Sequence, residues 1–493
     1  MALTVRKRAI MVLEQGWLDM RKEMCLLYVG TVLVILLIPF VGMSLWANDE
    51  AMANEELKEW PRFWEDGNWN VEYLREAGAY FENHFAFRQQ MITAISILWE
   101  KTLGVSAASQ VVAGKDGWLY FSGTLDDYLG RDLLSERELY DVVHNLSMMQ
   151  EFVEGQGGEF YLMIVPNKNT LYGEYMPYYY RAGESSNLEK LTPLMKEAGI
   201  HYVDLLTSFE SEEETLYFQR DSHWNNEGAL LAYRTLMDEV GKRHETYLNV
   251  PRFSKEDHVG DIEEMMYPSA VKPEEEIYFD KEWGYRYQNE VEDNMDSWIE
   301  TENPHKEGTF LMYRDSFGEA ILPFLADEYG KAYFSRLVPY NLNQVLTYGP
   351  GTVVVEKVER NISDFATDVP VMEPPLVEYA AVLEKQTDTT IELEKNGGYL
   401  VIRGAIDKEY MEADSEIYVS VSDMSRGDIK TYQAFYTLTD AERTGTIGRG
   451  NGYQIYLRRG SLLSEQFHVN VIVRTDGQSY IVASEDVEVE WEE

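Results

Sequence analysis

Two short polar stretches of the sequence hold residue types that together could transfer an acyl group. "DSHWNN" contains Asp221 and His223, followed by Trp224, whose ring could shield the pair from water. "RDSFG" contains Ser316. A serine hydroxyl becomes a good nucleophile when a neighbouring base accepts its proton, and imidazole titrates near neutral pH. A nearby carboxylate can orient that imidazole, so the three side chains suggest a Ser–His–Asp acyl-transfer site.

Each stretch also has an ordinary structural explanation. Ser316 and Glu319 fit a capping box, in which a serine and a glutamate three positions later bind backbone N–H groups at the start of a helix. Asp221 fits a turn residue, and either Asn225 or Asn226 fits a helix cap. From either stretch alone, both explanations stay open.

The elements that must position these residues alternate between strands and helices over residues 105–370. Strands are expected at "EFYLMIVPNK", "IHYVDL", "GTFLMY", "KAYFSRLVPY" and "TVVVEKVERN". Helical spacing separates them, so the pattern predicts an α/β domain with a mostly parallel sheet. Ser316 and the Asp221–His223 pair each follow an expected strand, and parallel sheets place their sites at the carboxyl ends of strands. No GxSxG motif occurs, which excludes the nucleophile elbow of α/β-hydrolases.

The composition excludes several other kinds of chemistry. The formal net charge of −43 would repel phosphate backbones, so no nucleic-acid partner is expected. The single cysteine, Cys25, allows neither a disulfide nor a cysteine metal cluster within the chain. Because Cys25 lies in the most hydrophobic segment, a thiol nucleophile in the soluble part is also excluded. Histidines such as His201 and His258 show no ligand spacing and no HExxH occurs, so no metal or other cofactor is expected.

Residues 24–46, "MCLLYVGTVLVILLIPFVGMSLW", contain no charged residue. An apolar run of this length can span a bilayer as a helix. The tail at residues 1–23 carries several Lys and Arg residues, whereas acidic residues follow the run, so the tail is expected in the cytoplasm and the rest outside. The alternative is a cleaved signal peptide with "AMA" at residues 51–53 as its cleavage site, although the apolar run is longer than a usual signal core.

Four further segments flank or interrupt the α/β domain. Residues 47–104 are expected to form a helical lead-in. Residues 250–308 form an acidic aromatic insertion, either a lid over a site or a solvated excursion. Residues 371–380 are rich in proline, which is typical of a linker. Alternating polar and apolar residues over 381–493 predict a C-terminal β-sandwich.

Taken together, these stretches resemble a known family. "RDSFG" is similar to the nucleophile block of SGNH hydrolases. "DSHWNNEGA" is similar to the DxHW signature of alginate O-acetyltransferases of the AlgJ/AlgX type and of DHHW proteins. "YFENHFAFRQQM", "VVAGKDGWLYFSG", "PNKNTLYGEYMP" and "VVVEKVERN" extend the resemblance over roughly residues 55–370. In this family the Asp–His pair precedes the serine, as it does here, and the resemblance implies an SGNH-like, flavodoxin-like fold.

The resemblance also implies roles for particular residues. It makes Ser316 the nucleophile, His223 the general base and acid, and Asp221 the residue that orients the histidine. Arg314 stands where the family has glycine before the Asp-Ser pair, so the local turn is expected to differ. The further candidates for substrate or oxyanion contacts are Trp224, Arg336, Asn341, Asn167, Lys168 and Arg314.

The implied activity is transfer of acetyl groups to a cell-surface or exported polysaccharide through a serine acyl-enzyme. The expected partners are this polymer and a membrane-bound O-acyltransferase that passes acetyl groups across the bilayer. Two alternatives are an esterase of the same fold and a non-catalytic polysaccharide-binding or assembly protein whose serine is only a helix cap. The β-sandwich could hold the polymer, with Tyr453, Tyr456 and Tyr480 either as sugar platforms or as packing residues.

Overall fold

The computed structural model describes residues 2–43, 57–65, 67–378, 383–424, 428–440, 445–462 and 465–489. The chain divides into two compact units. The first comprises Met1–Ala113 and Val259–Pro273, and the second comprises Gly114–His258 and Glu274–Glu493. Residues 44–46 of the expected anchor and the alternative cleavage site at 51–53 lie outside the described residues.

The first unit is mainly helical. Its long helix α1 (Ala2–Met43) includes an apolar stretch from Lys22 to Met43 with a mean hydropathy of 2.7. Because this stretch is long enough to cross a bilayer, α1 is a candidate membrane anchor. The other elements of the unit are β1 (Trp64–Glu65), β2 (Asn68–Trp69), α2 (Tyr73–His84), α3 (Arg88–Leu103), β3 (Val111–Ala113) and α10 (Asp261–Met266).

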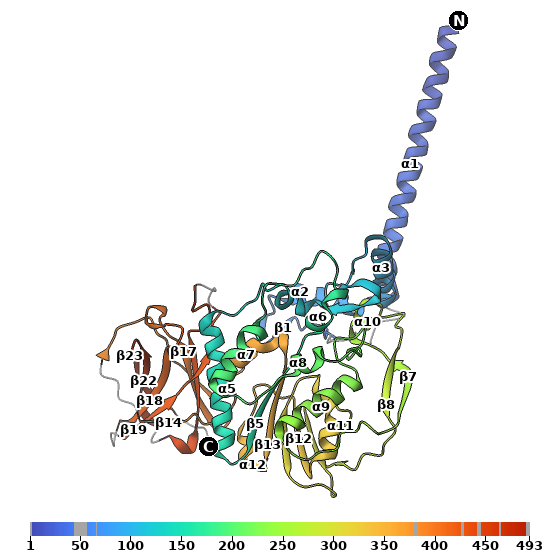
Figure 1. Ribbon diagram of the computed structural model, residues 1–493. Helices are drawn as coiled ribbons and strands as arrows, with labels where there is room; N and C mark the ends of the chain where they lie inside the picture. Colours follow the sequence, from blue (N-terminus) through green and yellow to red (C-terminus); the bar gives the residue numbers. More distant parts are fainter. Residues whose placement is uncertain are drawn as a thin grey trace. The chain divides into compact units, whose positions relative to one another are not determined.

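The second unit is built on a seven-stranded sheet (Figure 1). Five neighbouring strands are parallel, in the order β6 (Tyr202–Val203), β5 (Glu159–Val165), β13 (Thr352–Val358), β11 (Thr309–Tyr313) and β12 (Lys331–Ser335). These are the five strands expected from the apolar runs, so the predicted α/β fold is confirmed. β13 is the last of them in sequence but lies in the centre, between β5 and β11. From the expected insertion, β10 (Trp298–Glu302) and β9 (Arg286–Tyr287) continue the sheet beyond β12 with antiparallel pairing.

Helices cover both faces of this sheet (Figure 1). They are α4 (Leu125–Tyr128), α5 (Glu136–Gly155), α6 (Lys168–Leu171), α7 (Asn187–Ala198), α8 (Leu205–Glu210), α9 (Asn226–Val240), α11 (Gly318–Glu328) and α12 (Asn343–Tyr348). On β5, Phe160 and Ile164 point into one apolar cluster with α5 and α7. Tyr161 and Val165 point into the other cluster, with α9 and α11. Because both faces are buried, β5 is apolar from Phe160 to Val165, which is why its sequence contains a continuous apolar run.

Two further sheets of the second unit share one apolar core. Their strand orders are β14–β19–β18–β22–β23–β15 and β16–β17–β21–β20, which is the predicted β-sandwich. The strands are β14 (Leu376–Val377), β15 (Leu383–Glu384), β16 (Glu392–Asn396), β17 (Tyr399–Ala405), β18 (Glu416–Asp423), β19 (Ile429–Gln433), β20 (Phe435–Thr437), β21 (Gly452–Arg458), β22 (Gln466–Thr475) and β23 (Gln478–Glu488). β14 falls within the expected linker and pairs with β19. The unit also contains β4 (Leu119–Phe121) and a hairpin of β7 (Arg252–His258) and β8 (Glu274–Phe279).

Two of the three tyrosines considered as sugar platforms are buried. Tyr453 is completely buried, and its hydroxyl donates a hydrogen bond to the carbonyl of Thr390 at 2.9 Å. Tyr456 is 6% exposed, packs edge-on against Tyr399 and is one of the residues that line a cavity of about 230 Å³. Packing therefore accounts for Tyr453 and Tyr456, while Tyr480 is partly exposed.

Candidate active site

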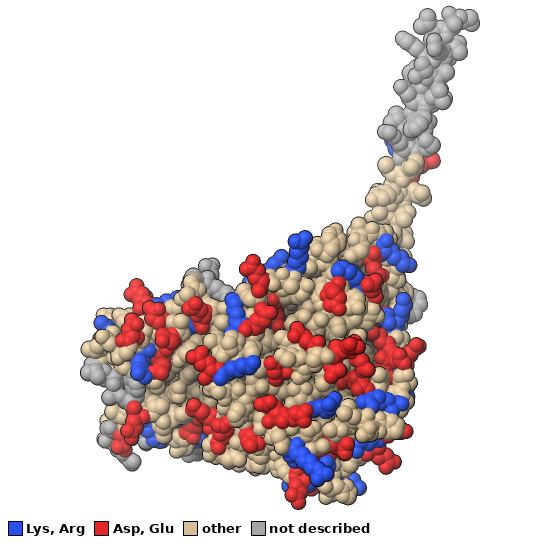
Figure 2. Space-filling view, in the orientation of Figure 1, with Lys and Arg blue, Asp and Glu red and all other residues tan. Residues whose placement is uncertain are grey.

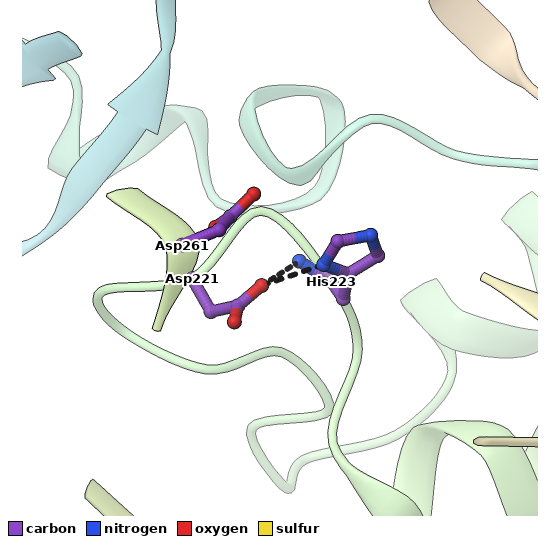
Figure 3. Close-up of side chains that lie close together, drawn as sticks. All are labelled: Asp221, His223 and Asp261. Carbon is purple, nitrogen blue, oxygen red and sulfur yellow. Dashed lines mark hydrogen bonds and ion pairs between the residues drawn. The ribbon is translucent and has the colours of Figure 1, made fainter. Parts of the chain in front are cut away.

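Three side chains from two separate loops form a continuous chain of hydrogen bonds. Oγ of Ser316 lies 2.8 Å from Nε2 of His223, and Nδ1 of the same ring lies 2.7 Å from Oδ1 of Asp221. Asp221 is buried, whereas the side chain of His223 keeps 27% of its surface exposed. Figure 3 shows Asp221 and His223 joined on their loop; Asp261, which is also drawn, belongs to the other unit. With a proton on Nδ1, the ring can accept a second proton from the serine at Nε2.

The turn around Asp221 fixes the position of the histidine. Oδ1 of Asp221 accepts a hydrogen bond from the backbone N–H of His223 at 2.8 Å, in addition to the bond from the ring. A β-bridge between Tyr217 and Trp224 closes the loop, and the side chain of Asn225 caps the first turn of α9. Asp221 is thus both a turn residue and the partner of the ring. The turn explanation and the acyl-transfer explanation are therefore compatible.

The turn that carries Ser316 is held by the residue before it. Oδ1 of Asp315 accepts from the N–H of Phe317 at 2.9 Å, and Oδ2 accepts from the N–H of Val358 at 2.9 Å, at the end of β13. The N–H of Asp315 donates to Oε2 of Glu356, which is completely buried on the same strand. Asp315 therefore ties the turn after β11 to the neighbouring strand and fixes where Ser316 stands.

The capping box expected at Ser316 does not form. α11 begins without a side-chain cap, and the N–H of Glu319 donates to the backbone carbonyl of Ser316 at 3.2 Å. Oγ of Ser316 bonds to His223 instead. The hydroxyl therefore lies at the beginning of an eleven-residue helix, where the exposed N–H groups and the helix dipole favour negative charge.

A second histidine contacts the carboxylate of Asp221. His258, at the end of β7, places Nε2 2.9 Å from Oδ2 of Asp221. Its ring stacks on Phe218, with 3.6 Å between the centroids. Each oxygen of the carboxylate is thus bound by a different imidazole. No sequence pattern indicates this contact, because His258 lies 37 positions after Asp221 and no motif surrounds it.

The two imidazoles lower the pKa of the Asp221 carboxyl group by more than burial raises it. Burial by itself raises the pKa of Asp221, but the charges and hydrogen bonds of His223 and His258 lower that pKa well below its usual value. Burial likewise lowers the pKa of His258, but the hydrogen bond to Asp221 and the nearby Glu276 and Glu274 raise it overall. Asp221 is therefore ionised at neutral pH and can stabilise a positive charge on His223.

Trp224 forms an aromatic wall behind the histidine. The ring of Phe317 lies 4.8 Å from that of His223 and meets Trp224 edge-on at 5.2 Å. On its other side Trp224 stacks against Phe209. Only 2% of Trp224 is exposed, so it packs within the core next to the site. It does not present a surface for substrate.

Lys168 and Asn167, considered as substrate or oxyanion contacts, are both buried and already engaged. Nζ of Lys168 donates to the carbonyls of Leu119 and Gln219 at 2.7 Å and to that of Asp221 at 2.9 Å. Lys168 therefore holds in place the backbone of the loop that carries His223. Nδ2 of Asn167 donates to Oδ2 of the buried Asp127 at 2.8 Å. Both residues follow β5 as expected, and their side chains are engaged within the chain.

Arg314 and Arg336 hold the insertion. The guanidinium of Arg314, which is 1% exposed, donates to the carbonyls of Asn294 and Asp296. Nη1 of Arg336 donates to the carbonyl of Met295 at 2.7 Å. Among the described contacts, neither arginine binds Ser316 or His223. Asn341 is exposed, and its side chain accepts from the N–H of Asn343 at the start of α12. A role of these three residues in binding substrate stays a prediction.

Comparison with known proteins shows which family part of this chain resembles. Residues 111–282 match the family model of the SGNH hydrolase-like domain of the acetyltransferase AlgX. The matched range includes Asp221, His223 and His258 and ends before Ser316. The match confirms the family resemblance predicted from the sequence and supports an O-acetyltransferase.

Three solved structures match the chain at low sequence identity. Bacillus cereus PatB1 is 16% identical with a TM-score of 0.41, and the match covers 51% of this chain and 96% of that one. The O-acetyltransferase domain of Pseudomonas putida AlgJ is 17% identical with a TM-score of 0.36, covering 51% and 92%. Pseudomonas aeruginosa AlgX is 14% identical with a TM-score of 0.34, covering 71% and 86%. Among the curated protein sequences compared, none matches this chain.

Proposed function

We propose that the chain is a membrane-anchored O-acetyltransferase that acetylates a cell-surface or exported polysaccharide outside the cell membrane. One observation carries this proposal: the hydrogen-bond chain Asp221–His223–Ser316 lies in a protein whose residues 111–282 match an acetyltransferase family model. The three residues are of the types, and lie at the distances, that two-step acyl transfer requires.

In the first step the acetyl group moves to Ser316. Nε2 of His223 accepts the hydroxyl proton while Oγ attacks the acetyl carbonyl of the donor. The oxyanion that forms lies at the positive end of α11, where the N–H of Ser316 can donate to it. The intermediate then breaks the bond between the acetyl carbon and the donor, and the leaving group takes the proton from His223. Asp221 stabilises the imidazolium in between.

In the second step a hydroxyl of the polysaccharide takes the place of the leaving group. His223 accepts the proton of that hydroxyl, and its oxygen attacks the carbonyl of acetyl-Ser316. The second intermediate breaks the bond to Oγ, which recovers its proton from His223. The products are an acetylated sugar and the original enzyme, so no external proton or redox partner is consumed.

An esterase of the same fold is the second candidate function. The side chain of His223 is 27% exposed, so part of the ring is open to solvent. Water and a sugar hydroxyl use the same histidine in the same way, and the three residues alone do not select between them. The two functions are therefore separated by the fate of the acetyl group, because a transferase leaves it on the polymer and an esterase releases acetate.

The proposed location follows from α1 and the charges on either side of it. The tail before the apolar stretch carries Arg6, Lys7 and Arg8, which favour a cytoplasmic N-terminus and leave the second unit outside. Acetyl-CoA is scarce there, so the donor we propose is a membrane-bound O-acyltransferase that delivers acetyl groups through the bilayer. The anchor would keep the chain beside such a partner.

The net charge of the molecule favours one charge type of polysaccharide over another. The formal net charge is −43, and Figure 2 shows acidic side chains distributed over the visible face with fewer basic ones between them. Such a surface repels polyanions at low ionic strength. We therefore propose a neutral or cationic polysaccharide as the acceptor.

The test offers the full-length protein an acetyl ester and a neutral oligosaccharide. The proposal predicts that acetyl appears on the sugar with wild type and with Ser147→Ala, a serine-to-alanine control on α5. It predicts that Ser316→Ala abolishes this product while the protein remains folded. Acetate release without sugar acetylation would support the esterase. Unchanged turnover by Ser316→Ala would contradict both functions.

A further inference from the structure

Helix α3 of the first unit turns its apolar side outwards. Met91, Ile95, Leu98 and Trp99 recur at helical spacing and are between 39% and 59% exposed. The opposite side is buried, yet it contains the polar Thr93 and Ser96. Oγ1 of Thr93, for example, accepts from the N–H of Ser269 at 3.0 Å, within the same unit. An ordinary surface helix has the reverse arrangement, with its apolar stripe inside.

Exposed tryptophans gather in the same part of the chain. Among the side chains that the structure describes, the exposed tryptophans are Trp60, Trp64, Trp69 and Trp99, each 44% to 60% exposed. Trp118 and Trp224 of the second unit are buried. Trp is enriched where proteins meet the headgroup region of a bilayer, because its ring is apolar and its N–H is polar.

The apolar span of α1 ends directly against the start of α3. A Cβ atom added to Gly42, in the last turn of α1, would lie 2.5 Å from Cβ of Ala86 and 3.5 Å from Cε2 of Phe87. α3 begins at the next residue, Arg88. The end of the candidate membrane span therefore touches the beginning of the helix whose apolar side faces outwards, and Phe87 itself is 44% exposed.

The charge of this region also suits a bilayer. Residues 57–104 contain five basic residues (Lys58, Arg62, Arg75, Arg88, Lys101) and seven acidic ones (Glu59, Glu65, Asp66, Glu72, Glu76, Glu82, Glu100), a net charge of −2. The whole chain has a net charge of −43. A nearly neutral apolar surface can enter the headgroup region without the repulsion that the rest of the molecule would meet at anionic lipids.

We propose that α3 and the tryptophan-rich segment 60–69 form a membrane-docking face that inserts into the outer headgroup region of the bilayer that α1 spans. Amphipathic helices bind in this way, with the apolar face at the boundary between headgroups and acyl chains. This inference rests on the proposed membrane anchor. It adds a second point of contact with the membrane, which would fix how the first unit is rotated about the axis of α1.

The test uses single-cysteine versions of the full-length protein in phosphatidylcholine vesicles. The native Cys25 lies within the span and is the only cysteine, so it reports on the anchor itself. Cys25→Ser combined with Leu98→Cys reports on the docking face, and Cys25→Ser combined with Tyr178→Cys is the control. Tyr178 is 82% exposed in the second unit, whereas Leu98 is 59% exposed. Each cysteine carries an environment-sensitive fluorophore, which is quenched by spin-labelled lipid or by iodide in the water.

The proposal predicts that a shallow lipid-borne quencher reduces the signal at position 98 several-fold more than at position 178. Iodide should show the opposite order. If position 98 is as accessible to iodide as position 178, or if both quenchers fail there because protein covers the face, the docking face is refuted. Cys25 lies near the cytoplasmic end of the span, so a probe there that neither a shallow nor a deep lipid quencher reaches would instead refute the anchor of the proposed function. The two failures are therefore distinguishable.

Discussion

At the scale of single residues, the carboxylate of Asp221 is hydrogen-bonded to two histidines. Substituting His258 tests the importance of these bonds without removing the proposed base, His223. His258→Gln retains an N–H donor toward Asp221, whereas His258→Phe retains the stacking on Phe218 and removes the donor. We expect His258→Phe to lower kcat/KM about 10-fold or more and His258→Gln to recover much of that loss, because outer hydrogen bonds orient the groups that act. Steady-state kinetics on an acetyl ester measure both. Equal losses of kcat/KM in the two variants would show that His258 acts through packing alone and not through its hydrogen bond.

The pH dependence of stability follows from the same contact. The pKa of His258 is raised in the folded protein, so the folded state holds this proton more tightly than the unfolded state. The stabilisation is complete below the unfolded pKa of about 6.5 and is lost as pH rises through the raised value. The unfolding temperature of wild type should therefore exceed that of His258→Phe by more at about pH 6 than at about pH 9. A difference that grows with pH would contradict the contact.

The residues themselves were predictable to different degrees. Asp221, His223 and Ser316 stand in short motifs, and residue type and order were enough to predict that their side chains meet. Lys168 follows a strand end, as predicted, but strand position does not reveal that its side chain turns down toward three carbonyl groups. His258 could not be found, because only the folding of β7 brings it to Asp221.

At the scale of elements, Lys168 joins the end of β5 to the loop before α9. Lys168→Met keeps the length of the side chain but leaves the carbonyls of Leu119, Gln219 and Asp221 without this donor. The Gln219 carbonyl keeps the N–H of Leu119 as a donor, so two carbonyls lose their partner. Buried acceptors left unsatisfied cost about 1–3 kcal/mol each, so we expect the free energy of unfolding to fall by about 2–6 kcal/mol and acetyl transfer to fall with it. Lys196→Met, on the exposed side of α7, should change stability by less than about 0.5 kcal/mol. Denaturant titration compares them, and similar values would contradict the role of Lys168.

The positions of the strands are easier to predict from the sequence than their order in the sheet. The parallel strands are mostly apolar, because helices bury both of their faces, although β13 also contains the buried Glu356 and Lys357. The position of β13 between β5 and β11 depends on contacts between residues far apart in sequence, which periodicity does not encode. β9 and β10 lie in an acidic aromatic segment, so they give no comparable apolar signal.

At the scale of the whole second unit, α5 connects the α/β layers with the sandwich. Nδ2 of Asn145 donates to the carbonyls of Phe365 and Tyr436 at 2.8 Å, and its Oδ1 accepts from the N–H of Tyr436 at 2.9 Å. Asn145 is completely buried, so Asn145→Ala should lower the free energy of unfolding by about 2–5 kcal/mol. Ser147→Ala on the same helix is the control. If both variants unfold like wild type in guanidinium chloride, this connection does not stabilise the unit.

This connection also marks a limit of prediction at the largest scale. Alternating residues predict the sandwich, and apolar runs predict the α/β sheet, because both patterns are local. A proline-rich segment suggests a linker between them, but β14 from that segment pairs with β19. The inclusion of residues 259–273 in the first unit likewise depends on contacts distant in sequence.

The most direct test of the central claim is to look for acetyl on Ser316 itself. Wild type and Ser316→Ala are mixed briefly with p-nitrophenyl acetate, quenched in acid, digested and analysed by mass spectrometry. The account predicts an acetylated peptide containing Ser316 in wild type, its disappearance when a competent oligosaccharide is added, and a much smaller yield in His223→Ala. Acetylation that is absent from Ser316, or that does not require His223, would contradict an acyl-enzyme formed by this chain of hydrogen bonds.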